Sequence, residues 1–194
     1  MRKPVVFMVS RGVPSGVIRT LKREVPAVFG APVRIERGVD VLDGAYNESR
    51  RQYDAIRVIR NVLDAAPETA AKAIAVVNED LFIPVLTHVI GEAQLGGSAG
   101  ALSIFRLRLG LPGGGNREAV FRRRVLVEAV HELGHTFGLT HCGDFLCPMS
   151  VSTGSRHVDR KSTAPCASCR FLLDGTPAVP AADAPVSNIA AGRW

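Results

Sequence analysis

Hydrophobic residues along the chain gather in short runs whose spacing predicts several strands. Residues 4–9 form an apolar run with β-branched side chains, which is typical of a buried strand. Residues 32–36 alternate apolar and polar positions, which favours a strand with one face covered. A third apolar run covers residues 73–77, and two further strand candidates, 85–94 and 101–107, flank a glycine-rich turn. We expect these segments to build one sheet.

Between the strands, apolar residues recur at helical spacing. Helices are predicted over residues 16–24, 48–65 and 117–138. A residue that can cap a helix precedes each of them, namely Ser15, Asn47 and Asn116. This alternation of strands and helices predicts an α/β domain with a mixed, mostly parallel twisted sheet, in which the last strand pair supplies an antiparallel edge strand.

The last of these helices carries charge inside its apolar pattern. Arg122, Arg123 and Arg124 occupy its first turns, and we interpret them as a solvated basic face. Glu128 has two interpretations: it supports His131 from behind, or it pairs with Arg124 one turn away. The pairing with Arg124 is the favoured one.

The end of the same helix holds the strongest chemical pattern of the chain. His131 and His135 lie one turn apart on one helix face, so both imidazoles can reach one metal ion. Glu132 follows about 100° around the helix, close to a metal-bound water. Gly138 can adopt the left-handed conformation that ends a helix. His141 can then return as a third ligand, which leaves a fourth position for water, as a catalytic zinc requires.

The alternative for this segment is a buried helix whose histidines only satisfy one another in the core. Three of the 5 histidines of the chain fall within residues 131–141. Such clustering of a rare residue type favours a metal site over core histidines.

All 4 cysteines lie in and beyond this segment, at Cys142, Cys147, Cys166 and Cys169. They form two pairs at spacings close to those of structural zinc sites, enough for one four-thiolate centre. Because His141 and Cys142 are adjacent in an extended segment, they can face two different metals. Two disulfides or free thiols are the alternatives.

Composition limits the other functional classes. The net charge of +6 permits contact with nucleic acid, but the arginines are dispersed and aromatic residues make up only 6% of the chain. We therefore do not expect nucleic acid as a partner. No apolar run is long enough to span a bilayer, and the first run is too short for a secretory signal. A cytoplasmic location is the expectation, and there cysteine clusters bind metal more often than they form disulfides.

The three-histidine motif followed by Cys147-Pro148-Met149 resembles the metzincin clan of zinc peptidases, and the cysteine pattern is similar to that of the archaemetzincins. The resemblance implies a zincin-like fold and a catalytic zinc bound by His131, His135 and His141. It also implies Glu132 as general base and acid, Met149 as the methionine turn beneath the metal, and a second, structural zinc on the four cysteines. The strand near Val89–Gln94 would form the upper rim of the cleft and pair with extended substrate.

These patterns together predict an organisation and a function. Residues 1–138 are expected to form an upper subdomain, 139–173 a zinc-stapled lower subdomain, and 174–194 a disordered tail. The leading hypothesis is a monomeric metallopeptidase that holds two Zn²⁺ ions and cuts peptide or protein substrates. A catalytically silent two-zinc module that binds peptides or proteins is the competing one.

Overall fold

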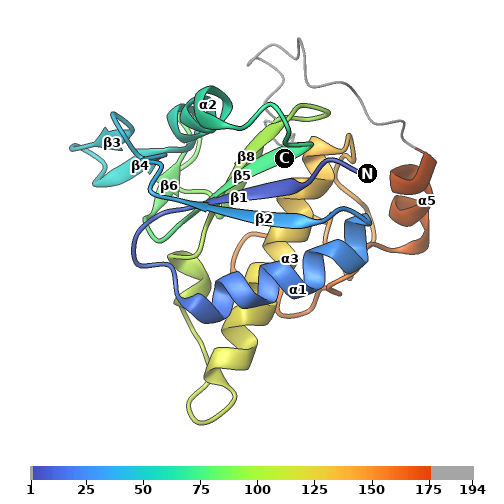
Figure 1. Cartoon of the computed structure of the whole chain (residues 1–194). Helices are drawn as coiled ribbons and strands as arrows, with labels where there is room; N and C mark the ends of the chain where they lie inside the picture. Colours follow the sequence, from blue (N-terminus) through green and yellow to red (C-terminus); the bar gives the residue numbers. More distant parts are fainter. Residues whose placement is uncertain (1, 176–194) are drawn as a thin grey trace.

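The computed structural model describes residues 2–175, and a five-stranded sheet forms its centre (Figure 1). Its strand order is β2 (Val33–Arg37), β1 (Val5–Val9), β5 (Lys72–Val77), β8 (Ala99–Ser103) and β7 (Gly91–Ala93). The first four strands are parallel, whereas β7 pairs antiparallel with β8 and lies at the edge. The predicted mixed sheet with an antiparallel edge strand is therefore confirmed.

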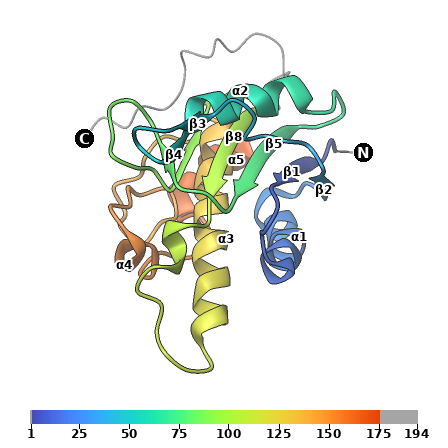
Figure 2. The same cartoon turned by 90° about the vertical axis from the view of Figure 1, so that its left-hand side faces the viewer.

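Helices cover both faces of this sheet. Helices α1 (Ser15–Phe29) and α3 (Arg117–Thr136) lie on one face, and α2 (Ala55–Ala65) lies on the other (Figures 1 and 2). Strand β1 shows why its apolar run is continuous rather than alternating. Val5, Phe7 and Val9 pack in the core beside α1 and α3, while Val6 and Met8 pack in the core beside α2. A strand buried on both faces needs apolar residues at every position.

A second, smaller sheet contradicts part of the predicted helix 48–65. Strands β3 (Tyr46–Asn47), β4 (Gln52–Asp54) and β6 (Leu81–Phe82) form it, and α2 begins only at Ala55. Asp54 is the residue that caps α2, because its side chain accepts a hydrogen bond from Ile56 N at 2.9 Å. The Asn47 side chain instead accepts from Arg50 N at 3.0 Å within the β3–β4 turn.

The strand predicted over residues 85–94 is also wrong for most of its length. Only Gly91–Ala93 pair as β7, and the residues before them form a loop. Arg50 donates to the carbonyls of Leu86 at 2.9 Å and Pro84 at 3.3 Å, which holds this loop in place. Similarly, strand 101–107 is replaced by β8 and a short 3-10 helix, η1 (Arg106–Arg108).

The segment after α3 contains α4 (Ser155–Val158) and α5 (Ala167–Gly175). Arg170 of α5 donates to the carbonyl of Val28 in α1 at 2.6 Å, which ties the end of the described chain to its first helix. The predicted tail begins at residue 174, inside α5, and residues 176–194 lie outside the described residues. None of the helices between residues 2 and 175 has the length and apolar character needed to cross a bilayer.

Candidate metal centres and active-site cleft

The last two turns of α3 bring His131 and His135 to one face of the helix, as their spacing predicts. His131 Nδ1 donates to the carbonyl of Pro148 at 2.7 Å, and His135 Nδ1 donates to the carbonyl of Leu139 at 2.8 Å. Because a backbone carbonyl can only accept, each Nδ1 carries the proton. The two Nε2 atoms, 3.0 Å apart, therefore present their lone pairs to the same point.

His141 reaches this point because the chain reverses after α3. Gly138 has a φ of +91°, the left-handed conformation expected from the sequence, and its N–H donates to the carbonyl of His135 at 2.9 Å. One ligand atom from each of His131, His135 and His141 lies within 4.8 Å of the others. Whereas the first two rings are buried, His141 is exposed, so the cluster opens to solvent on that side.

These three imidazoles are in the form that binds a metal. Burial, assisted by the neighbouring imidazole of His135, holds the pKa of His131 well below its usual range. Burial also lowers the pKa of His135 to about 4 and the pKa of His141 below its usual value. All three rings are thus neutral near pH 7, with Nε2 unprotonated in the two buried ones. This donor set fits a zinc ion with an open coordination position.

Glu132 lies beside the histidines at the floor of a cleft and is 3% exposed. Its carboxylate packs against Gly91 of β7, where any Cβ would overlap with the Glu132 side chain. Burial raises the pKa of Glu132 well above its usual range, and the carboxyls of Glu92 and Glu128 raise it further. A carboxyl with a raised pKa can hold a proton near neutral pH and release it again.

Met149 is fully buried against the last turns of α3. A Cβ at Gly134, between the two helical histidines, would overlap with Met149 Sδ. Glycine inside a helix costs about 1 kcal/mol relative to alanine. Here it lets the methionine approach the backbone of α3, which explains why a helix-weakening residue lies in the middle of the motif.

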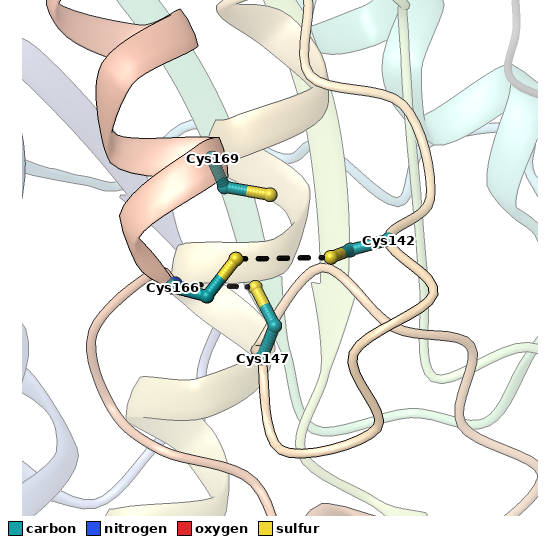
Figure 3. A group of neighbouring side chains, drawn as sticks. All are labelled: Cys142, Cys147, Cys166 and Cys169. Carbon is teal, nitrogen blue, oxygen red and sulfur yellow. Dashed lines mark hydrogen bonds between the residues drawn. The ribbon is translucent and has the colours of Figure 1, made fainter.

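The four cysteines form a separate cluster (Figure 3). Cys166 immediately precedes α5 and Cys169 lies in its first turn, whereas Cys142 and Cys147 come from the loop that follows α3. One sulfur of each lies within 4.8 Å of the others, and Cys142 Sγ and Cys166 Sγ are 3.8 Å apart. All four cysteines are free rather than disulfide-bonded. Four thiols converging on one point fit a closed tetrahedral zinc site.

The histidine and cysteine clusters adjoin at His141 and Cys142. Cys142 N donates to the carbonyl of Met149 at 3.0 Å, so a backbone hydrogen bond joins the start of this loop to the segment around Met149. Consecutive side chains of an extended segment point to opposite sides, which lets the two residues serve different clusters.

Two buried charged residues near the histidines were not predicted from the sequence. Lys161 is 1% exposed and donates to the carbonyls of Ser150 and, at 3.1 Å, Pro148, the carbonyl that also accepts from His131. Glu92 of β7 is 6% exposed and lines the same cleft as Glu132. The sequence does contain a hint for Glu92, because it is a charged residue within the apolar run 89–93. Lys161 lies in a loop, where a lysine is not unusual.

Arg124 corrects two sequence interpretations. It is 1% exposed rather than solvated, and its guanidinium forms two hydrogen bonds with the Asp159 carboxylate at 2.7 and 2.8 Å. The favoured pairing with Glu128 is therefore wrong. Glu128 instead accepts from Ser152 Oγ at 3.4 Å and lies close enough to Lys161 for that charge to lower its pKa, although burial raises it more.

The cleft itself lies between β7 with its preceding loop and the end of α3. Its upper wall consists of Ile83, Leu86, Thr87, His88, Val89 and β7, and its floor includes Glu128, Glu132 and the three histidines. Val151, Ser152 and Thr153 close the lower side. One edge of β7 pairs with β8, and the strand order leaves its other edge free of partner strands in the described sheet.

Comparison with known proteins identifies a family. Residues 10–174 match the model of Peptidase family M54. Archaemetzincins from Haloquadratum walsbyi and Archaeoglobus fulgidus are 36% and 34% identical to this chain, over 82% and 84% of it and 93% and 95% of their own lengths.

Solved structures agree with this assignment. The archaemetzincin of Methanopyrus kandleri superposes with a TM-score of 0.77 at 29% identity, covering 89% of this chain and 94% of its own. A zinc-dependent peptidase from Methanocorpusculum labreanum gives a TM-score of 0.75 at 27% identity, covering 87% of this chain and 99% of its own. The chain therefore belongs to Peptidase family M54, the archaemetzincin family of zinc metallopeptidases.

Proposed function

We propose that this zinc metallopeptidase hydrolyses peptide bonds with His131, His135 and His141 as the ligands of the catalytic zinc and Glu132 as general base and acid. The observation that carries the proposal is the convergence of three neutral imidazoles at the floor of a cleft, with a buried carboxyl beside them. Membership of a peptidase family supports turnover over the catalytically silent alternative.

Zinc at the three histidines would lower the pKa of a water molecule and polarise the scissile carbonyl. The protein supplies the proton transfers. Glu132 accepts the proton of the attacking water and then gives it to the leaving amine, since its burial favours the protonated form after the first step. Because Gly91 has no side chain, the Glu132 carboxyl can occupy the space beside β7. Any other residue at position 91 would overlap with it. The free edge of β7 can hydrogen-bond to extended substrate backbone alongside.

We also propose that Cys142, Cys147, Cys166 and Cys169 bind a second, structural zinc. A site with four protein ligands has no coordination position left for water, so its contribution is to folding. In this arrangement residues 1–138 form an upper subdomain and residues 139–173 a lower one that the second zinc stabilises. Met149 supports the histidines from below, in contact with Gly134.

Glu132→Gln tests the assignment most directly. The substitution keeps size and hydrogen bonding but cannot accept a proton, so peptide hydrolysis should fall by about 10²–10⁴-fold while metal content stays at two ions per chain. Glu118→Gln, a change of the same kind at an exposed position of α3, is the matched control and should keep full activity. Equal turnover by the two variants would remove Glu132 from the mechanism.

Metal analysis tests the zinc count independently of activity. His131→Ala should lower the zinc content from two ions to one and leave the second bound. A content of one zinc in the unaltered protein would contradict the two-site proposal.

Two further proposals concern the setting of the enzyme. Free cysteines at metal-binding distance suit a reducing compartment, which supports a cytoplasmic location. A monomer is proposed because cleft, ligands and catalytic carboxyl all come from one chain. Fractionation of the source cells and sedimentation of the purified protein test these two statements.

A further inference from the structure

The upper wall of the cleft contains an acid without a partner. Within the described residues 2–175, Glu92 Oε1 is the one buried side-chain nitrogen or oxygen that lacks a hydrogen bond. Glu92 is 94% buried, yet it lines the cleft rather than the closed core. An unpaired carboxyl in such a place is unfavourable on its own, and natural proteins keep one mainly where function needs it.

The alternation of β7 shows on which side of the strand this carboxyl lies. A Cβ at Gly91 would point at Glu132, so Gly91 faces α3. Its neighbour Glu92 therefore faces the opposite side of the sheet. Its register partner on β8, Ala101, belongs to the core cluster beside α2, which confirms the direction.

The walls around Glu92 on that side are apolar. Ile83, Leu86 and Val89 line the same cleft and belong to, or pack against, the cluster beside α2. Arg50 and Gln52 hold the backbone of their loop through the carbonyls of Pro84, Leu86 and Thr87. The hollow thus combines a fixed aliphatic wall with a single carboxyl.

This combination suits one class of side chain. Lysine and arginine have a long aliphatic stem and a cationic tip, and they bury the stem along apolar surface while the tip seeks an anion. Two basic groups near the cleft are already engaged: Lys161 donates to Pro148 and Ser150, and Arg106, close to His88, pairs with Asp80 at 2.6 Å. Neither donates to Glu92 Oε1, so this carboxyl oxygen stays available to a ligand.

We propose that Glu92 forms a specificity subsite that receives a lysine or arginine side chain of the peptide substrate. The proposal rests on the proposed peptidase function, in which extended substrate pairs with the free edge of β7. Substrate side chains then alternate between the α3 side, with the histidines, and the α2 side, with Glu92. Glu92 is a specificity residue here and takes no part in the proton transfers of Glu132.

The test uses the zinc-loaded protein and short peptides in which one lysine is moved along an otherwise neutral sequence, with norleucine at the same position as the reference. At one position the lysine peptide should be cleaved with a kcat/KM about tenfold higher than its norleucine counterpart. Glu92→Gln should abolish this preference, so that the kcat/KM of the lysine peptide and that of its norleucine counterpart become equal. Glu118→Gln, which removes an exposed charge, should retain the preference.

Binding separates this proposal from the peptidase proposal. Calorimetry with the Glu132→Gln protein should show the lysine peptide binding about tenfold tighter than the norleucine peptide, and the difference should vanish when Glu92→Gln is added. Preferential binding without any hydrolysis by the unaltered protein would overturn the catalytic assignment and keep the subsite. Equal binding and cleavage of both peptides at every position in the unaltered protein would overturn the subsite, whatever the fate of the variants.

Discussion

The histidine cluster and the cysteine cluster adjoin in the sequence but differ in nearly every physical respect. The histidines open into a cleft through the exposed His141, and buried acids surround them. The cysteines converge on one another between a loop and α5, and Cys147 and Cys169 are buried. An open donor set leaves room for a reacting water, whereas a closed one uses all of its donors to hold the chain. Adjacent ligands can therefore have separate roles, one chemical and one structural.

The largest difference between the two clusters is expected when one residue of each is substituted. Cys147→Ser should lower the free energy of unfolding by at least about 3 kcal/mol and the Tm by roughly 6–12 °C, because a closed thiolate site contributes directly to folding. His141→Ala, at an exposed position, should leave the Tm within a few degrees but abolish hydrolysis. Thermal unfolding followed by circular dichroism measures both.

Similar Tm losses in the two variants would show that both sites are structural. Loss of hydrolysis with an unchanged Tm in Cys147→Ser would contradict the structural role of the cysteine site.

The pH dependence of stability tests the environment of Glu92 in the cleft. Burial raises the pKa of Glu92 from its usual 4.5 to about 8. The folded protein thus binds a proton at Glu92 more tightly than the unfolded chain does. The contribution of this proton to the free energy of unfolding is complete below pH 4.5 and is lost as the pH rises through 8. Between pH 5.5 and 8.5 the free energy of unfolding of the unaltered protein should fall by about 3 kcal/mol more than that of Glu92→Gln.

Urea unfolding of both proteins at the two pH values measures this difference, and the titration of groups that do not interact with Glu92 cancels between them. Parallel pH profiles for the two proteins would mean that Glu92 is ionised in the fold and already paired.

The smallest effect is expected where Met149 packs against Gly134 of α3. Gly134→Ala places a Cβ against Met149 Sδ, so the methionine must move. Crowding of this kind costs about 1–3 kcal/mol, and activity should fall because the histidines shift with α3. Gly16→Ala is the matched helical control, since its Cβ would meet only the ends of the flexible Glu118 and Arg122 side chains.

Chemical denaturation and peptide turnover of the two variants test this prediction. A gain in stability for Gly134→Ala, as helix propensity alone would give, would show that Met149 adapts freely.

Periodicity and spacing were sufficient for several long elements and for the grouping of the three histidines and of the four cysteines. The buried strand β1, the edge pair β7–β8 and α3 with its histidines follow from local patterns. The left-handed Gly138 follows likewise from its position at the end of α3. These features depend on short-range sequence rules, since helical and extended spacing alone decide which side chains share a face.

The errors lie where distant segments set the outcome. Residues 48–54 became a turn and strand because β6 pairs with β4, and residues 85–90 became a loop because Arg50 and Gln52 bind their carbonyls. Arg124 is buried because Asp159, far along the chain, supplies its counter-charge.

The sequence by itself determined that two histidines and a glutamate share the end of one helix, that a third histidine follows its terminal glycine, and that four cysteines come next. Only the tertiary structure decided what surrounds them: Lys161 beneath Pro148, Gly91 against Glu132, and Glu92 unpaired in the upper wall. The reason is physical, because ligand spacing is set by local backbone geometry, whereas burial and the pairing of charges depend on segments that meet only after folding.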